Sequence, residues 1–596
     1  PENAGLPLSA ASGGRGPAWP VVVAPYRPAV SRDWWGAADL YRRWALRHAA
    51  WTTQGPLVQR DDVPVWALNL TVWVNSHWQP NDIFNVSGGA PNVVEQRVGA
   101  IVDRFALGEN VELGLHWYEW DKLGYTNNYT NCTSEVTCGF DTHYPEYFPA
   151  RDGFKGAMVA LQQKGVRVCP YVNGRIFDQG TGTWRNDPMA AKAAAKSAQP
   201  ALYGQTGLAL YDESYGSKAE FAVMCPHAAY WQGTMADVVG NLTRDEIRYG
   251  TNGVYVDQVA AAGPRPCFDA SHGHALGGGN HWVTGYLDML GEMRQRAGND
   301  KLLLTESNAE PFMGKLDMFL TLVGFGGGAL SPPPSAAAAV DAADAADAAD
   351  APYIVPAFQS VYGGYVLFMG AEFYIADFLP NPNVFAAKIA NQLLFGAQLG
   401  WFSLGGRYNI DNPVPLYDLF MDEMYDDEVD YLRTLSNAKR AAQDFLVHGR
   451  AGRFIDGLVI NGTADAERRV SRAHPRHRAR RMEYGEYEEK EKDAVTDLYF
   501  APVMTGTWLA ADGESLLVIM TTVERYTPAT AQATLDLGRY GFGDVHDDKF
   551  DVWTVPVDGG APAKVGGPFQ GNAVRVEASL GVRAVTMLRI GTSAER

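Results

Sequence analysis

Two acidic residues, Asp257 and Glu306, stand at the ends of short apolar runs that are typical of buried β-strands. The runs cover residues 253–256 and 302–304. Neighbouring strands lie about 4.8 Å apart, so acids at the ends of adjacent strands can hold their carboxyl groups about 5–5.5 Å apart. That separation suits retaining hydrolysis of a glycosidic bond. We therefore predict Asp257 as the nucleophile and Glu306 as the general acid/base.

A single acid at a strand end is more often a helix N-cap or the partner of a nearby arginine, so the surrounding residues matter. Other polar and aromatic residues also follow the predicted strands, and such side chains read sugar hydroxyls and stack on sugar rings. Arg175 would help to keep Asp257 ionised, and Glu310 is the reserve candidate for the acid. We predict that the substrate-binding residues are His116, Trp117, Glu119, Asp121, Asn173, Arg175, Gln258, His272, His274, Trp282 and Glu310.

The loop that follows Asp257 raises a second possibility, because Asp269, His272 and His274 could bind a metal ion. The pattern Asp-x-x-His-x-His is weak, and polar residues of a loop usually satisfy one another. We predict neither a metal nor any other cofactor. A metal-dependent hydrolase that uses these histidines is kept as a third hypothesis, which a metal analysis would test.

The elements that must position these residues alternate between apolar runs and helical stretches. We predict strands at residues 65–74, 111–117, 166–172, 253–256, 302–304, 318–322, 357–369 and 399–404, and helices at residues 34–50, 154–164, 230–249 and 282–296. Continuous apolar strands that alternate with helices indicate a parallel sheet covered by helices, and about eight units favour an α/β fold with a closed (β/α)₈ TIM barrel. Active sites of such barrels lie at the C-terminal ends of the strands, where both acids fall.

The character of the sequence changes near residue 443, where apolar and polar residues begin to alternate between Gly, Asp and Pro turns. This pattern predicts a C-terminal antiparallel β-sandwich over residues 443–596, with a charged insertion at 465–493. The barrel is expected over residues 61–442, with a low-complexity insertion at 326–352. Residues 1–60 are expected to form a strap and a helix left over from an upstream region.

The composition and the cysteines bear on location and partners. A net charge of −18 argues against nucleic-acid binding, and no segment is apolar enough to span a membrane. The chain begins without Met or a leader, as a processed secretory protein would. We predict a secreted or lumenal protein with disulfides from Cys132, Cys138, Cys225 and Cys267, a buried thiol at Cys169, and glycosylation at Asn69, Asn85, Asn128, Asn131, Asn241 and Asn461. A cytosolic protein with reduced cysteines is the alternative.

Several short motifs then resemble a known family. They include Tyr171-Val-Asn-Gly-Arg175, Val254-Tyr-Val-Asp-Gln258 and Thr305-Glu306, and the resemblance extends over about residues 30–440. The chain resembles a largely uncharacterised family of TIM-barrel glycoside hydrolase-like proteins from bacteria and algae. It is more distantly similar to the endo-α-N-acetylgalactosaminidases of glycoside hydrolase family 101 and to α-amylase-like barrels. The resemblance implies the same roles for Asp257 and Glu306, although Tyr255 stands where the α-amylase pattern has Arg.

The leading hypothesis is a retaining glycoside hydrolase that acts on α-linked sugars of a glycan or polysaccharide. The alternative is a catalytically inactive barrel that binds carbohydrate or serves as a structural part of an extracellular assembly. Hydrolysis of a panel of aryl glycosides separates the two hypotheses.

Overall fold

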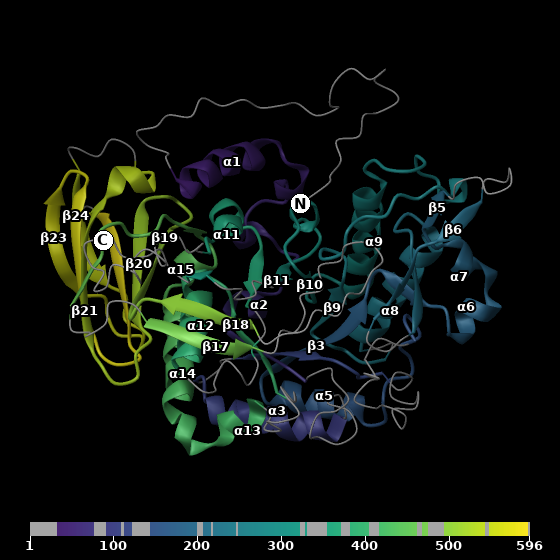
Figure 1. The fold of residues 1–596 in the computed structure, drawn as a ribbon, viewed down its shortest axis with the longest axis horizontal. Helices are drawn as coiled ribbons and strands as arrows, with labels where there is room; N and C mark the ends of the chain where they lie inside the picture. Colours follow the sequence, from purple (N-terminus) through teal and green to yellow (C-terminus); the bar gives the residue numbers. More distant parts are fainter. Residues whose placement is uncertain are drawn as a thin grey trace.

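The computed structural model describes residues 33–76, 91–108, 112–121, 143–198, 207–215, 219–245, 248–321, 328–329, 354–370, 373, 382–404, 416–461, 468–474, 494–542 and 548–593. Its centre is a sheet of eight parallel strands (Figure 1). The strands are β1 (Val72–Asn75), β2 (Leu113–Trp117), β3 (Val166–Asn173), β9 (Gly253–Asp257), β10 (Leu302–Glu306), β11 (Met318–Leu320), β13 (Leu367–Met369) and β14 (Leu399–Ser403). These strands are short and almost wholly buried, as expected of strands covered on both faces.

The strands follow one another around the sheet in chain order, and β14 pairs with β1. Two hydrogen bonds close the remaining gap: Gln398 donates to the Phe368 carbonyl (2.7 Å), and Gly370 donates to the Gln398 carbonyl (2.8 Å). The (β/α)₈ barrel is therefore confirmed. Asp257 and Glu306 are the last residues of its fourth and fifth strands.

Helices cover the outside of the barrel. They are α2 (Val65–Asn69), α3 (Pro91–Phe105), α5 (Phe154–Gln163), α8 (Ala229–Thr243), α9 (His281–Ala297), α11 (Ala357–Tyr362), α12 (Pro382–Leu394), α13 (Leu416–Met421), α14 (Asp426–Ala441) and α15 (Gln443–Leu446). Two predicted strands, at residues 65–74 and 357–369, each begin with a helix instead, α2 and α11. Pro64 and Pro356 precede those helices, and the fixed φ of proline favours the start of a helical turn.

A small subdomain stands between β3 and α8 at the right of Figure 1. It contains β4 (Ile176–Asp178), α6 (Gly182–Asn186), α7 (Pro188–Lys192), β5 (Lys196–Ala198), β6 (Leu208–Leu210), β7 (Asp212–Ser214) and β8 (Glu220–Val223). β4, β8 and β7 form one antiparallel sheet, and β5 and β6 form another. This subdomain contributes residues to the site described below.

The barrel interior is packed with aromatic rings beneath the two acids. The His116 ring lies 4.0 Å from that of Tyr255 and 5.5 Å from that of Trp401, between ring centroids. One layer lower, Gly114 leaves room for Trp73, because a Cβ at position 114 would lie 2.4 Å from the Trp73 ring. The interior is therefore a solid core, as in other barrels of this fold, and open space can exist only at its ends.

The C-terminal part is an antiparallel sandwich, as predicted. One sheet has the order β15 (Arg450–Ala451), β19 (Val503–Leu509), β20 (Ser515–Thr522), β25 (Val585–Thr592), β22 (Lys549–Thr554) and β23 (Lys564–Gln570). The other has the order β16 (Val459–Asn461), β21 (Ala529–Asp536) and β24 (Ala573–Leu580). Every second residue of β21 and β24 is buried, which is the signature of a sheet with one face on the core. Figure 1 shows α12 and α14 between the sandwich and the barrel.

The N-terminal helix α1 (Trp34–His48) joins the barrel to the sandwich. The Trp35 indole donates to the Ala451 carbonyl (3.0 Å), and its ring is part of the sandwich core. On the barrel side, Tyr41 donates to Glu310 (2.7 Å). The first helix of the described chain is thus held by residues far along the sequence.

The two predicted insertions lie mostly outside the described residues. Their described parts are β12 (Gly328–Ala329) and β17 (Arg468–His474), which both pair with β18 (Ala494–Phe500), the strand just after the second insertion. Within the described residues, no helix has the length and apolar character needed to cross a membrane.

Candidate active site

The two acids stand side by side at the C-terminal end of the barrel. Leu304 of β10 pairs with Tyr255 of β9, and two residues further along each strand stand Glu306 and Asp257. The two carboxyl groups lie close enough to interact, and each shifts the pKa of the other. Both residues are partly exposed to solvent.

The surroundings drive the protonation states of this pair apart. Burial, together with the negative charge of Asp257 and the hydrogen bond to it, raises the pKa of Glu306 to about 9. Burial also raises the pKa of Asp257, but hydrogen bonds from Tyr171, Glu306 and the Gln258 backbone oppose that shift. At neutral pH, Glu306 therefore holds the shared proton and Asp257 carries the charge.

Asp257 is held by groups from the neighbouring strand β3. The Tyr171 hydroxyl donates to Asp257 Oδ2 (2.7 Å), and Asn173 Nδ2 lies 3.5 Å from the same oxygen. The other end of the Asn173 amide accepts hydrogen bonds from the backbone N–H groups of Arg175 (2.9 Å) and Ile176 (3.2 Å). The amide is thus fixed with its NH₂ group toward Asp257.

The residue after each acid has an unusual backbone conformation. Gln258 has φ 64° and Ser307 has φ 63°, and neither is glycine. Such left-handed residues cost free energy and collect at functional sites. Here they end both strands immediately after the acid, so each carboxyl group stands on the last residue of a rigid element.

The charge of Arg175 lowers the pKa of Asp257, as predicted, but the direct partner of Arg175 is Glu213. Its guanidinium forms a bidentate ion pair with Glu213 of β7 (2.5 and 2.8 Å), and Arg265 binds the same carboxylate (2.7 Å). Although burial alone would raise it, these arginines hold the pKa of Glu213 at about 2. Arg175 also lies 3.4 Å from Gln258 Oε1, so it supports the loop beside Asp257 and acts on Asp257 only through its charge.

Several predicted substrate-binding residues are buried in packing contacts. His116 lies inside the barrel and accepts a hydrogen bond from Trp401 (2.9 Å), and burial lowers the pKa of its imidazole well below the usual value. The Trp117 ring faces outward and packs on Phe154 of α5 (4.9 Å). Trp282 is buried on α9. The substrate-binding roles of these residues stay predictions.

Two predicted acids, Glu119 and Glu310, have side-chain partners in the protein, and Asp121 is bound through its backbone carbonyl. Glu119 lies 3.6 Å from Arg151, whose guanidinium also donates to the Asp121 carbonyl (3.3 Å). Glu310 accepts hydrogen bonds from the hydroxyls of Tyr41 and Tyr362. These contacts hold Glu310 against α1 and α11, where it anchors the N-terminal helix to the barrel.

The histidines of the loop after Asp257 lie in a cluster of their own with Cys225 and Cys267. The predicted disulfide between these two cysteines is wrong for this structure, because both are free thiols and each sulfur contacts a histidine nitrogen. Cys169 is a free, buried thiol, as predicted. Among the predicted glycosylation sites, Asn69, Asn241 and Asn461 belong to the described residues; Cys132, Cys138, Asn85, Asn128 and Asn131 lie outside them.

Sequence reasoning missed Tyr171, Glu213, Arg265 and Trp401. Tyr171 could have been found, because it stands two residues before Asn173 and side chains alternate along a strand. Glu213 carries no such signal. It belongs to a short strand of the small subdomain, and only the tertiary fold brings it to Arg175.

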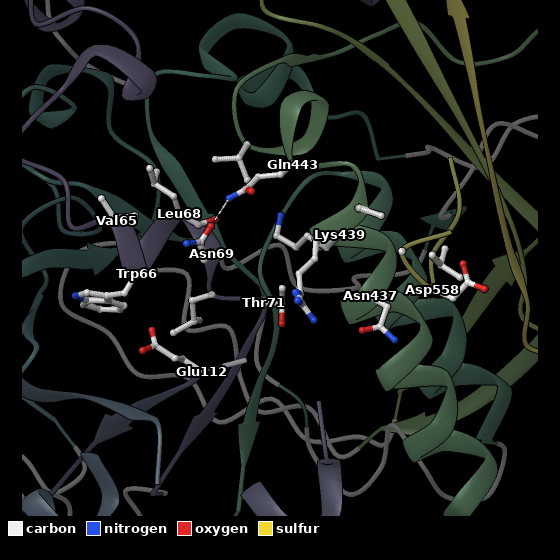
Figure 2. Close-up of a pocket in the computed structure, with 16 residues that line it drawn as sticks. Val65, Trp66, Leu68, Asn69, Thr71, Glu112, Asn437, Lys439, Gln443 and Asp558 are labelled. Carbon is white, nitrogen blue, oxygen red and sulfur yellow. Dashed lines mark hydrogen bonds between the residues drawn. The ribbon is translucent and has the colours of Figure 1, made fainter. Parts of the chain in front are cut away.

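A large cavity of about 830 Å³ lies elsewhere, at the opposite end of the barrel (Figure 2). Its walls include residues 65–66 and 68–71 before β1, Glu112 before β2, and residues 557–559 of the sandwich. The two acids do not line it. Lys439 of α14 does, and its ammonium donates to the Gly396 carbonyl (2.8 Å). Burial lowers the pKa of Lys439 to about 7.

We expect Lys439→Met to stabilise the protein at pH 7 by on the order of 2 kcal/mol, because the buried charge of Lys439 pairs with no acid among the described residues and so costs free energy. The folded pKa lies below the unfolded value of 10.5, so the wild type gains stability as pH rises from about 7 toward 10.5. The gain from the substitution should shrink over that window. Urea unfolding at pH 7 and pH 9.5 measures it, with Arg440→Met, exposed on the same helix, as the control. Equal gains at both pH values would contradict the prediction.

The fold and the paired acids define a glycoside hydrolase-like barrel. The chain belongs to the family described as "Domain of unknown function (DUF6259)", whose sequence profile matches residues 17–133 and 136–374. The resemblance to an uncharacterised family of hydrolase-like barrels is thereby confirmed.

Two curated relatives have informative names. "Putative glycoside hydrolase 22789" of Monosiga brevicollis is 37% identical over 425 residues, which are 70% of this chain and 33% of the relative. "Putative glycoside hydrolase" of Bacteroides thetaiotaomicron is 29% identical over 351 residues, 59% of this chain and 42% of the relative. The chain thus spans less than half the length of either relative.

Solved structures similar to the chain include two glycosidases. The α-N-acetylgalactosaminidase NagBb of Bifidobacterium bifidum has 12% identity and a TM-score of 0.46, over 82% of this chain and 62% of that one. The α-amylase of Geobacillus thermoleovorans has 11% identity and a TM-score of 0.47, over 88% of this chain and 99% of that one. The barrel itself is defined by the strand order of this chain.

Proposed function

We propose that the protein is a retaining glycoside hydrolase that acts on α-linked sugars of a glycan or polysaccharide, with Asp257 as nucleophile and Glu306 as general acid/base. The observation that carries the proposal is the pair of acids that end the neighbouring strands β9 and β10 at the same level. At neutral pH Glu306 is protonated and Asp257 is ionised. Double displacement requires one acid of each kind, a proton donor and a nucleophile.

The geometry favours retention over inversion. Inverting enzymes keep their two carboxyl groups about 6.5–9.5 Å apart, so that a water molecule fits between one of them and the sugar. Glu306 and Asp257 end neighbouring strands, which lie about 4.8 Å apart, and this favours the smaller separation of retaining enzymes. Asp257 would attack the anomeric carbon as Glu306 protonates the leaving oxygen, and Glu306 would then deprotonate the water that releases the sugar.

The preference for α-linked sugars rests on the resemblance to α-acting families, and the secretory location rests on the sequons. Hydrolysis of a panel of aryl α- and β-glycosides tests the reaction and the linkage together. Release of the aryl group from an α-glycoside, with a product of the same anomeric configuration by NMR, supports the proposal. An inverted product would contradict the retaining mechanism.

We expect Tyr171→Phe to lower kcat/KM about tenfold at acidic pH, because the lost hydroxyl stabilises the Asp257 carboxylate through a 2.7 Å hydrogen bond. Without it, the pKa of Asp257 rises, and the acidic limb of the pH profile should move toward higher pH. The pH dependence of kcat/KM measures the shift. Tyr211→Phe, which removes a hydroxyl bound to the Pro266 carbonyl, is the matched control. An unchanged acidic limb in Tyr171→Phe would contradict the role given to Tyr171.

A further inference from the structure

Four side chains beside the candidate active site are arranged as metal ligands. The donor atoms of Cys225, Cys267, His272 and His274 all lie within 4.8 Å of one another. Cys267 Sγ lies 3.4 Å from His272 Nδ1, and Cys225 Sγ lies 3.3 Å from His274 Nε2. With usual Zn–S and Zn–N bond lengths, a tetrahedral site has sulfur–nitrogen edges of about 3.5 Å. We propose that these four residues bind a structural zinc ion.

The histidines are oriented as zinc ligands are. The second nitrogen of each ring contacts a backbone carbonyl: His272 Nε2 that of Lys192 (2.8 Å) and His274 Nδ1 that of Ala275 (2.8 Å). A carbonyl only accepts, so these nitrogens carry the protons. The nitrogens that face the cysteines, His272 Nδ1 and His274 Nε2, are then free to bind a metal.

The backbone places the ligands without help from the metal. Cys267 exchanges two backbone hydrogen bonds with Gly277 (3.1 and 2.7 Å), which closes the loop that carries both histidines. Gly273 between the histidines has φ 78°, and this turn lets both rings face the same centre. Cys225 comes from the end of β8, where its N–H donates to the Ala193 carbonyl (3.0 Å). The site therefore joins two distant segments of the chain.

The ligand set indicates which metal binds and what it does. Two thiolates and two imidazoles suit Zn²⁺ and do not suit Mg²⁺ or Ca²⁺, which prefer oxygen. Four protein ligands fill a tetrahedral shell and leave no position for a reactive water. The ion would therefore be structural, in contrast to the metal-dependent hydrolase considered from the sequence.

The proposed zinc ion is linked to the carboxyl pair through the loop at residues 258–280. Zinc would pin this loop to the end of β8. Arg265, two residues before Cys267, binds Glu213, which in turn holds Arg175 beside Gln258. The metal would thus hold the ion-pair network next to Asp257. The site itself does not depend on the reaction proposed above.

Metal content tests the site without any substrate. Wild-type protein purified under reducing conditions should contain one zinc per chain by inductively coupled plasma mass spectrometry. Cys225→Ser and Cys267→Ser should each lose most of it, about tenfold or more, while Cys169→Ser, a buried thiol outside the cluster, should keep it. Zinc retained in both ligand variants would overturn the proposal.

A second measurement uses the unmodified protein, in case the variants fail to fold. Bound zinc should protect Cys225 and Cys267 from alkylation, and a chelator should expose both, as read by peptide mass mapping. Replacement of zinc by cobalt should give the intense visible bands of tetrahedral thiolate coordination. A Cys225–Cys267 disulfide in the native protein, or absence of metal after incubation with equimolar zinc, would overturn the proposal even if hydrolysis is confirmed.

Discussion

Asp257→Ala should lose at least about 10⁴-fold in kcat on any aryl glycoside that the wild type cleaves, because it removes the carboxylate proposed to attack the anomeric carbon. Sodium azide should restore turnover. Azide needs no base, and it can occupy the space left by the missing side chain on the face opposite the leaving group. The product should be a glycosyl azide of inverted anomeric configuration, which NMR identifies.

A matched control separates this effect from a general loss of stability. Asp300 stands just before β10, at the opposite end of the barrel, and its side chain is 76% exposed. Asp300→Ala should keep wild-type turnover and show no response to azide. If Asp257→Ala retains its activity, or if azide rescues neither turnover nor an azide product, Asp257 is not the nucleophile.

Glu306→Gln should lower kcat/KM by about 10²–10⁴-fold on substrates with poor leaving groups, because the amide cannot donate the proton that the leaving oxygen needs. Substrates with very good leaving groups need no such proton, so their first step should be nearly unaffected. The second step needs Glu306 as a base, and the glycosyl-enzyme should therefore accumulate. Intact-protein mass spectrometry would detect the added sugar.

The same residue sets the alkaline side of the pH profile. Glu306 must be protonated to act as the acid, so wild-type kcat/KM should persist to about pH 9 and fall as pH rises through that value. Asp257 must be ionised, so the acidic limb should lie above the ordinary range of an aspartate. Glu306→Gln should lose the alkaline limb. Glu292→Gln, exposed on α9, should keep it, and an alkaline limb unchanged in Glu306→Gln would contradict the assignment.

The sequence was sufficient to predict the barrel and its two acids because both depend on local signals. Apolar runs of strand length alternate with helices, and an acid that follows such a run must stand at the rim of a parallel barrel. The same logic was applied too loosely to His116 and Trp117. Neighbouring strand residues face opposite sides, so only one of them can point into the barrel, and the structure shows that it is His116.

The contacts that sequence reasoning missed link segments whose meeting depends on the whole fold. Cys225 and Cys267 were expected to lie close together, and they do. No local pattern showed that the imidazoles of two histidines would join them in one cluster. Glu213 likewise reaches Arg175 and Arg265 only because the small subdomain folds back over the barrel rim. Pairs of this kind follow from tertiary packing, which no short pattern encodes.

Helix α1 is synthesised long before the residue that binds its Trp35 side chain. Trp35 bonds to Ala451, 416 positions later in the chain. At about 5–20 residues per second, a ribosome needs about 20–80 s to make that stretch. During this interval the Trp35 side of α1 lacks its partner, so chaperone binding to the nascent chain and slow final docking of this side of α1 are expected.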